Sequence, residues 1–303
     1  MSPRDVFELL LLAAIWGASF LFQRAAAPEL PPAALVEIRV VVAALFLTGW
    51  LAARGALGQL RGHMKKLALL GAINSALPFT LFAFATATLP AGLTSVLNAT
   101  TPMFAVLIGF LWLRERLAPE RLLGLLIGFG GIVLLVSHKL SLAGDRTAVL
   151  AGLLAAACYG FSTHYTRKHL AGIPPLALSA GSLIGASIVL LPFALTSLPK
   201  AVPSTTSLLY ATVLGIVCTG VAYLLYFRLL RNVGPTRAIM VTYLIPVFGM
   251  AWGALFLAEH LSLQMLAGAA VVLTGTMLVV RGSRSAQPKV VTPCPNSPPR
   301  PAP

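Results

Sequence analysis

Two charged side chains, Glu37 and Arg39, stand deep inside an apolar stretch of this 303-residue chain. If the stretch crosses a membrane, a charge there costs about 2.5 to 3.5 kcal/mol on insertion scales and is expected to face a cavity or a partner. The two positions are about 200° apart around a helix, so the side chains cannot pair with each other on one face. We interpret Arg39 as part of an ion pair or as a solute contact, with a side chain that reaches the outer headgroups as the alternative. Glu37 is expected near the outer interface.

Catalytic and metal-binding patterns are missing from the sequence. It contains no Gly-x-Ser-x-Gly, no His-Glu-x-x-His and no paired acids in the middle of an apolar run. The cysteines, Cys158, Cys218 and Cys294, have neither disulfide nor metal spacing. Rings of like charge or a repeated carbonyl filter, expected of an ion channel, are not seen either. We therefore expect no enzyme, no metal and no cofactor. The alternatives are a channel or carrier for another small organic solute and, after these, an intramembrane enzyme.

Two pairs of aromatic residues have the spacing of one helix face. Phe79 and Phe82 are three positions apart, and so are Tyr223 and Tyr226. Residues at this spacing lie on the same side of a helix. Helix packing is one interpretation, and the lining of a shared cavity is the other, at even weight.

Prolines inside apolar runs predict broken or bent helices. A proline leaves the carbonyl four residues before it without a donor, and in lipid that carbonyl needs another partner. Polar residues stand just before Pro102 and Pro246 and either satisfy this carbonyl or contact a solute. The candidate solute contacts are Trp16, Ser19, Arg39, Asn74, Phe79, Phe82, Asn98, Thr101, Tyr159, Tyr223, Tyr226 and Tyr243. The candidate helix-break or gating residues are Pro78, Pro102 and Pro246. His164 is expected to be solvated near the cytoplasmic end of its span.

The elements that position these residues are membrane spans. The apolar share is 58% and the charged share only 10%, which a soluble domain with a polar surface cannot carry. Apolar runs long enough to cross a hydrocarbon core of about 30 Å occur ten times. They cover residues 6–24, 33–53, 66–88, 92–113, 120–138, 148–167, 175–197, 206–230, 235–257 and 263–281. The predicted fold is all-α, a polytopic membrane protein of ten transmembrane helices.

The second half of the chain repeats the first. A shift of 144 positions aligns Gly109 with Gly253 and Glu115 with Glu259 without a gap, together with further glycines and prolines. We predict one five-helix repeat over residues 1–140, a second over 147–283, and a disordered cytoplasmic tail over 284–303. Because five is odd, the second repeat must enter the membrane the opposite way round.

Basic residues support this inverted arrangement. With the N-terminus inside, 17 Lys and Arg fall on the cytoplasmic side and four on the other, as the bias of cytoplasmic loops requires. The net charge of +14 is thereby explained without nucleic acid. Both termini are predicted to be cytoplasmic. The glycine-rich spans at 120–138 and 263–281 are read as scaffold or as the surface of a possible homodimer.

Taken together, the Trp16-Gly17 and Ser19-Phe20 pairs, Arg39, the two prolines, Glu115 with Glu259, and the glycine-rich spans resemble the EamA-type members of the drug/metabolite transporter superfamily over residues 6–281. The resemblance implies a central cavity between the halves and export of small metabolites, often amino acids, across a bacterial inner membrane. The expected partners are a small-molecule solute and the lipid bilayer. The aromatic pairs favour amino acids with apolar or aromatic side chains, moved by alternating access.

Overall fold

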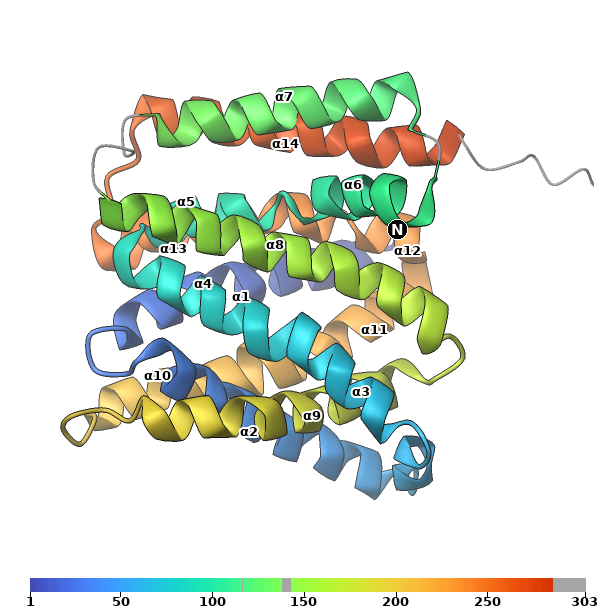
Figure 1. Ribbon diagram of the computed structural model, residues 1–303, viewed down its shortest axis with the longest axis vertical. Helices are drawn as coiled ribbons and strands as arrows, with labels where there is room; N and C mark the ends of the chain where they lie inside the picture. Colours follow the sequence, from blue (N-terminus) through green and yellow to red (C-terminus); the bar gives the residue numbers. More distant parts are fainter. Residues whose placement is uncertain (116, 138–142, 286–303) are drawn as a thin grey trace, which may run out of the picture.

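The computed structural model describes residues 1–115, 117–137 and 143–285, and every regular element within them is helical (Figure 1). The predicted tail begins inside the last helix, and residues 286–303 lie outside the described residues. In the first half the elements are α1 (Pro3–Ala26), α2 (Pro32–Ala53), η1 (Leu57–Leu60), α3 (Met64–Gly71), η2 (Ala72–Ala76), α4 (Leu77–Thr88), α5 (Ala91–Asn98), α6 (Thr101–Leu113) and α7 (Pro119–Val136). In the second half they are α8 (Ala143–His169), α9 (Pro175–Thr196), α10 (Thr205–Gly215), η3 (Ile216–Val221), α11 (Ala222–Val233), α12 (Pro235–Ala238), α13 (Val241–Leu257) and α14 (Leu263–Ser285).

Ten helical segments cross the molecule. Nine segments of the described chain are long and apolar enough to span a bilayer, and the tenth, α13, is shorter because a turn at residues 239–240 separates it from α12. The N-terminus and the end of α14 lie at the same end of the bundle (Figure 1). The prediction of an all-α polytopic membrane protein with ten crossings in two inverted five-helix repeats is confirmed.

The two repeats share local backbone features at a spacing of 144 residues. Arg114 and Ala258 close α6 and α13 in the left-handed conformation, with φ of 54° and 52°. In each case the next backbone N–H, of Glu115 or Glu259, donates to a glycine carbonyl at 3.1 Å. This is a common way to end a helix, because it satisfies a carbonyl of the last turn. The internal sequence repeat is therefore also a repeat of backbone geometry.

A wide helical turn interrupts one long span in each half. The π-helical segments η2 and η3 begin at Ala72 and Ile216, again 144 positions apart. A π-turn adds one residue to the helix and rotates the side chains that follow it, and it is often found at functional sites. These turns present Asn74 from the first half and Thr219 from the second to the interior.

The break in the fourth span lies directly before Pro102. The chain turns at Ala99 and Thr100 between α5 and α6. The Thr101 hydroxyl donates to the carbonyl of Asn98 at 2.8 Å, the carbonyl that Pro102 leaves without a backbone donor.

The ninth span differs from the expectation, because it turns at residues 239–240 and α13 then runs straight through Pro246. The backbone N–H groups of Thr242 and Tyr243 bond three residues back, to Ile239 and Met240, at 3.0 and 3.1 Å. This tighter turn places the interruption ahead of the proline.

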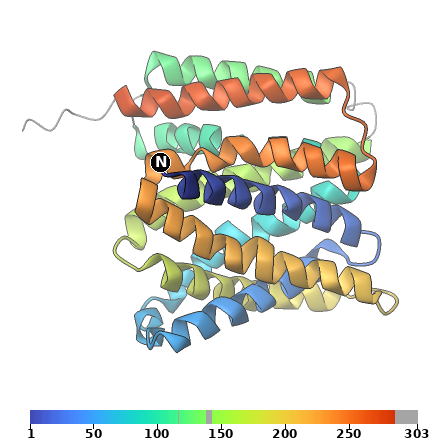
Figure 2. The ribbon, with the colours of Figure 1, turned by 180° about the vertical axis from the view of Figure 1, so that it is seen from behind.

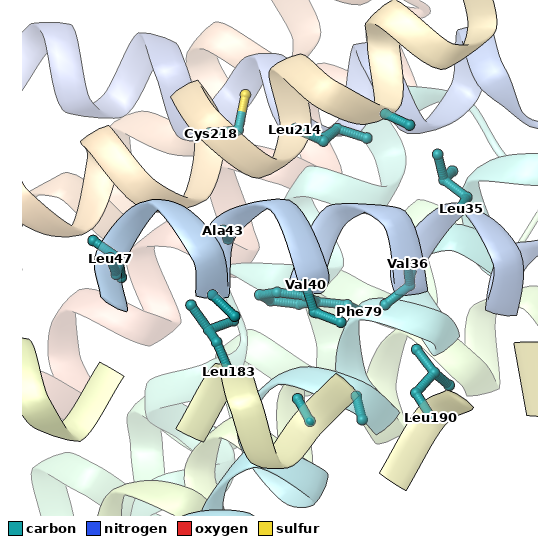
Figure 3. Close-up of a cluster of buried hydrophobic side chains, with 14 of the residues drawn as sticks. Leu35, Val36, Val40, Ala43, Leu47, Phe79, Leu183, Leu190, Leu214 and Cys218 are labelled. Carbon is teal, nitrogen blue, oxygen red and sulfur yellow. The ribbon is translucent and has the colours of Figure 1, made fainter. Parts of the chain in front are cut away.

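Two helix pairs flank the centre of the molecule. The α7 and α14 helices lie side by side in both views (Figures 1 and 2) and pack so closely that a Cβ on Gly275 would overlap the backbone of Gly128. On the other side α2 packs on α9, with Val36 and Val40 turned toward Leu183, and Phe79 belongs to the same cluster (Figure 3). The remaining spans fill the space between the pairs.

Candidate solute-binding site

A cavity of about 460 Å³ lies between the halves. Its walls come from both repeats, and the described residues that line it include no Asp, Glu, His or Lys. Eleven of the twelve candidate solute contacts line it: Trp16, Ser19, Arg39, Asn74, Phe79, Phe82, Asn98, Thr101, Tyr159, Tyr223 and Tyr226. Their role as solute contacts stays a prediction.

The other candidate residues lie outside the lining. Tyr243 does not line the cavity, because the turn at 239–240 sets the register of α13 and brings Val241, Thr242 and Ile245 to the wall instead. Pro78, Pro102 and Pro246 are also absent from it. The first two stand at the starts of α4 and α6, where a proline is well tolerated.

Arg39 supplies the only charged side chain of the described lining. It is 6% exposed, and its Nε donates to the Thr219 hydroxyl in η3 at 3.0 Å. Its Cζ stands 3.7 Å from the centre of the Phe79 ring, a cation–π contact that strengthens when water is excluded. None of the ion pairs among the described residues involves Arg39. We interpreted Arg39 as part of an ion pair or as a solute contact, and the described residues do not contain the ion pair.

Glu37 belongs to the helix interface and not to the cavity. It is 8% exposed and accepts a hydrogen bond from the Ser187 hydroxyl of α9 at 2.6 Å. Its carboxylate therefore joins α2 to α9.

Aromatic rings from both halves lie next to one another in the cavity wall. The ring centres of Phe79 and Phe82 stand 6.5 and 6.0 Å from that of Tyr159, and Phe20 meets Phe82 edge to face at 5.7 Å. These separations lie within the range of favourable aromatic pairs. The ring centres of Trp16 in the first half and Tyr226 in the second lie 5.4 Å apart, and both rings line the cavity. Aromatic walls with a few polar groups suit a small organic molecule.

The cavity lining reaches the surface at the end of the bundle that holds the N-terminus, which we call the open end. Its lining extends along α8 to Thr163, which is exposed, and to Thr166. At this end Glu115 accepts a hydrogen bond from Arg167 at 2.7 Å, and this contact holds the pKa of the Glu115 carboxyl below its usual value.

The opposite end, the closed end, is tied across the repeats. The Glu259 carboxylate accepts hydrogen bonds from the backbone N–H groups of Ala91 and Gly92 at 2.8 and 3.3 Å. It caps the start of α5, where the helix dipole favours a negative charge. Nearby, the Ser204 hydroxyl donates to Glu29 at 2.9 Å, which ties the α1–α2 link to the start of α10. Glu115 and Glu259, equivalent in sequence, thus make different contacts at the two ends.

Several lining residues were not singled out from the sequence. Gln23 lines the cavity and follows Ser19 by four residues and Trp16 by seven. These spacings place the three side chains on one helix face, so helical periodicity could have identified Gln23. Ser162 donates to the Asn74 side chain at 2.7 Å. Thr219 lines the cavity from the π-turn η3, and no pattern in the sequence predicts this turn.

His164 contradicts the expectation of a solvated side chain. It is 7% exposed, and its Nε2 lies 2.7 Å from the carbonyl of Ala105. Gly160, one turn earlier, has no side chain, so α8 approaches α6 closely. This close packing covers the His164 ring. Among the residues that the structure describes, no group of three or more His, Cys, Asp or Glu could hold a metal.

A cavity walled by both halves of an inverted repeat, with a broken helix and a π-turn at its edge, defines the chain as a protein of the secondary-transporter class. The sequence profile of the EamA-like transporter family matches residues 6–137 and again residues 146–281, so the chain belongs to this family.

Individual relatives resemble the chain over nearly its whole length. An uncharacterized transporter of Archaeoglobus fulgidus is 26% identical over 275 residues, which is 90% of this chain and 97% of the relative. A probable amino-acid metabolite efflux pump of Salmonella typhimurium is 27% identical over 301 residues, 94% of this chain and 97% of the relative. Protein PecM of Dickeya dadantii is 26% identical and covers 92% and 93%. A solved crystal structure at 17% identity superposes with a TM-score of 0.67 over 94% of this chain and 100% of its own, which shows a shared fold.

Proposed function

We propose that this chain is a secondary transporter that exports small metabolites, amino acids with apolar or aromatic side chains among them, by alternating access. One observation carries the proposal: the central cavity is lined by aromatic side chains of both repeats, with Arg39 as the one charged side chain among the described residues of its lining. A site between the repeats can be reached from either face as the halves rock. Its volume of about 460 Å³ falls within the range of about 300 to 1,000 Å³ of small-molecule sites.

The relatives support the solute class. Two of them, from Salmonella typhimurium and Escherichia coli, are named probable amino-acid metabolite efflux pumps. We place the chain in the bacterial inner membrane with both termini in the cytoplasm, which makes the open end of the cavity cytoplasmic. The outward faces of α7 and α14, with exposed Leu126, Val133 and Leu266, meet lipid or, in a homodimer, a second copy.

The cavity also bears on energy coupling. Proton-driven carriers commonly place Asp, Glu or His where the solute passes, and the described lining holds none of these. We therefore propose uniport or exchange driven by the solute gradient.

Transport in sealed vesicles tests the proposal. Purified protein in liposomes should give saturable uptake of labelled L-phenylalanine that unlabelled solute on the far side accelerates, at equal rates with and without a pH gradient. A non-saturating conductance would indicate a channel, and chemical conversion of the solute would indicate an enzyme. Flux that requires the pH gradient would overturn the coupling but keep the transporter.

A further inference from the structure

The closed end of the cavity holds a cation that the described protein does not neutralise. Arg39 is 6% exposed and has no carboxylate partner among the described residues. Only its Nε makes a hydrogen bond to a described residue, to Thr219, so its two terminal amino groups keep their donors unused. A buried charge is normally paired, so the missing partner points to a ligand.

The setting of this guanidinium selects the ligand group. The Phe79 ring covers one face of it at 3.7 Å, and Thr219 holds its Nε edge. The edge formed by the two terminal nitrogens makes no hydrogen bond to a described residue. A planar fork of this kind matches the two oxygens of a carboxylate in a bidentate pair.

A second unused polar atom belongs to Gln23. Its side chain is buried at 2% exposure and lines the same cavity. The Nε2 donates to the Ser19 carbonyl at 3.0 Å, while the Oε1 has no hydrogen-bond partner among the described residues. A buried amide oxygen normally has a donor, so Gln23 offers an acceptor that the protein leaves unfilled.

The two groups stand at neighbouring depths. Gln23 is three residues before the end of α1, about 5 Å at the rise of a helix, and Arg39 is seven residues after the start of α2, about 10 Å. The α1–α2 link spans only residues 27–31, so the two helix ends lie together. Both side chains line the same cavity.

We propose that Arg39 and Gln23 together recognise the α-amino-acid group. The carboxylate binds the terminal nitrogens of Arg39, the amino group donates to Gln23 Oε1, and the side chain of the solute extends among Phe79, Phe82 and Tyr159. This assignment rests on the proposed function and adds to it the chemical signature of the solute, with Gln23 as the residue that distinguishes an amino acid from a simple carboxylate.

Three related compounds separate the two contacts. Binding of L-phenylalanine, 3-phenylpropionate and phenethylamine to the purified full chain is measured by calorimetry. L-phenylalanine should bind about tenfold tighter than 3-phenylpropionate, because one more buried polar group is satisfied. Phenethylamine, which lacks the carboxylate, should show no measurable binding.

Variants assign the contacts to residues. Gln23→Leu should bind L-phenylalanine and 3-phenylpropionate equally, with the affinity for 3-phenylpropionate unchanged, whereas Arg39→Gln should weaken both by at least about tenfold. Gln59→Leu, which changes an exposed glutamine in η1, is the matched control and should behave like the unchanged protein. Melting temperatures show which variants are folded.

The outcomes divide cleanly. Phenethylamine that binds as tightly as L-phenylalanine would overturn the carboxylate contact even if Arg39→Gln does not fold, and a preserved preference in Gln23→Leu would overturn the role of Gln23. If vesicles move another solute but none of the three compounds binds, the headgroup assignment fails and the transporter stands. If vesicles move no solute at all, the proposed function fails as well.

Discussion

At the scale of single residues, the site is a buried cation set in an aromatic wall. Arg39 is held by two contacts from different parts of the chain, Phe79 in the first repeat and Thr219, 180 positions away, in the second. Because both halves hold this one side chain, a rocking motion of the halves changes its surroundings. The contacts of Arg39 are therefore expected to differ between a cavity open to one face of the membrane and a cavity open to the other.

Phe79→Ala should weaken the apparent affinity for the transported amino acid by about tenfold, because it removes a ring from the wall and the cation–π contact to Arg39. The measurement is the concentration dependence of uptake into liposomes. Phe84→Ala removes an exposed ring from the same helix and is the control. Equal affinities for both variants would show that Phe79 serves packing alone.

At the scale of elements, some helices connect the two repeats and others form the walls of the cavity. The α7–α14 pair lies away from the cavity and joins the repeats through glycines, whereas the broken and π-containing spans form the walls. In lipid, close backbone approach through small residues is a main source of helix association. Gly124, Gly131 and Gly275 therefore act as scaffold between α7 and α14 of the same chain.

Gly275→Val should destabilise the protein by about 1 to 3 kcal/mol, because the added side chain meets the backbone of Gly128. Gly130→Val places the same side chain on α7 where nothing lies within 4 Å, and it should leave stability nearly unchanged. Thermal unfolding in detergent compares the two. A similar loss for both would mean that the close packing of α7 on α14 does not limit stability.

Glu259→Ala should cost about 0.5 to 2 kcal/mol of stability, because the first two N–H groups of α5 lose their acceptor. Its repeat equivalent provides the control: Glu115→Ala breaks an exposed pair with Arg167, which is worth at most about 1 kcal/mol. Chemical or thermal unfolding of both variants gives the comparison. A larger loss for Glu115→Ala would contradict the view that the end held by Glu259 is the tightly closed one.

Features of the structure that depend on local interactions could be predicted from the sequence. The spans follow from apolar runs, so the helices were predictable, while their orientation, inferred from the basic links, stays a prediction. Tyr243 was misplaced and Thr219 missed because a turn at 239–240 and a π-turn change helical register without a clear signal. Gln23 was missed although it shares a helix face with Trp16 and Ser19, and the cavity shows that this face belongs to the wall.

At the scale of the whole molecule, the two halves form a shape with one open and one closed end. The lining reaches exposed Thr163 at the end that holds the N-terminus. Contacts between the halves occur at both ends, from Glu115 to Arg167 at this end and from Glu259 and Glu29 at the other. Inversion of the repeat means that the opposite arrangement is available to the same sequence. Under the alternating access that we propose, the described structure is one of the two states of the transporter.

The orientation of the bundle can be tested with single cysteines in a chain whose three native cysteines are replaced by alanine. Glu120→Cys and His260→Cys lie in exposed positions at opposite ends. An impermeant thiol reagent added outside intact cells should label only position 260, because the basic links stay in the cytoplasm. Labelling of both from the same side would contradict the inverted repeat.

The central claim is that the solute occupies the cavity between the repeats, and protection of a cysteine there measures this most directly. In the same cysteine-free chain, Asn98→Cys places a thiol on the cavity wall, and Lys200→Cys places one on an exposed link. With L-phenylalanine at ten times its dissociation constant, labelling at position 98 should slow about tenfold, because only the free protein reacts, while labelling at position 200 stays unchanged. Unchanged labelling at position 98, in vesicles that still transport L-phenylalanine, would show that the solute crosses by another route.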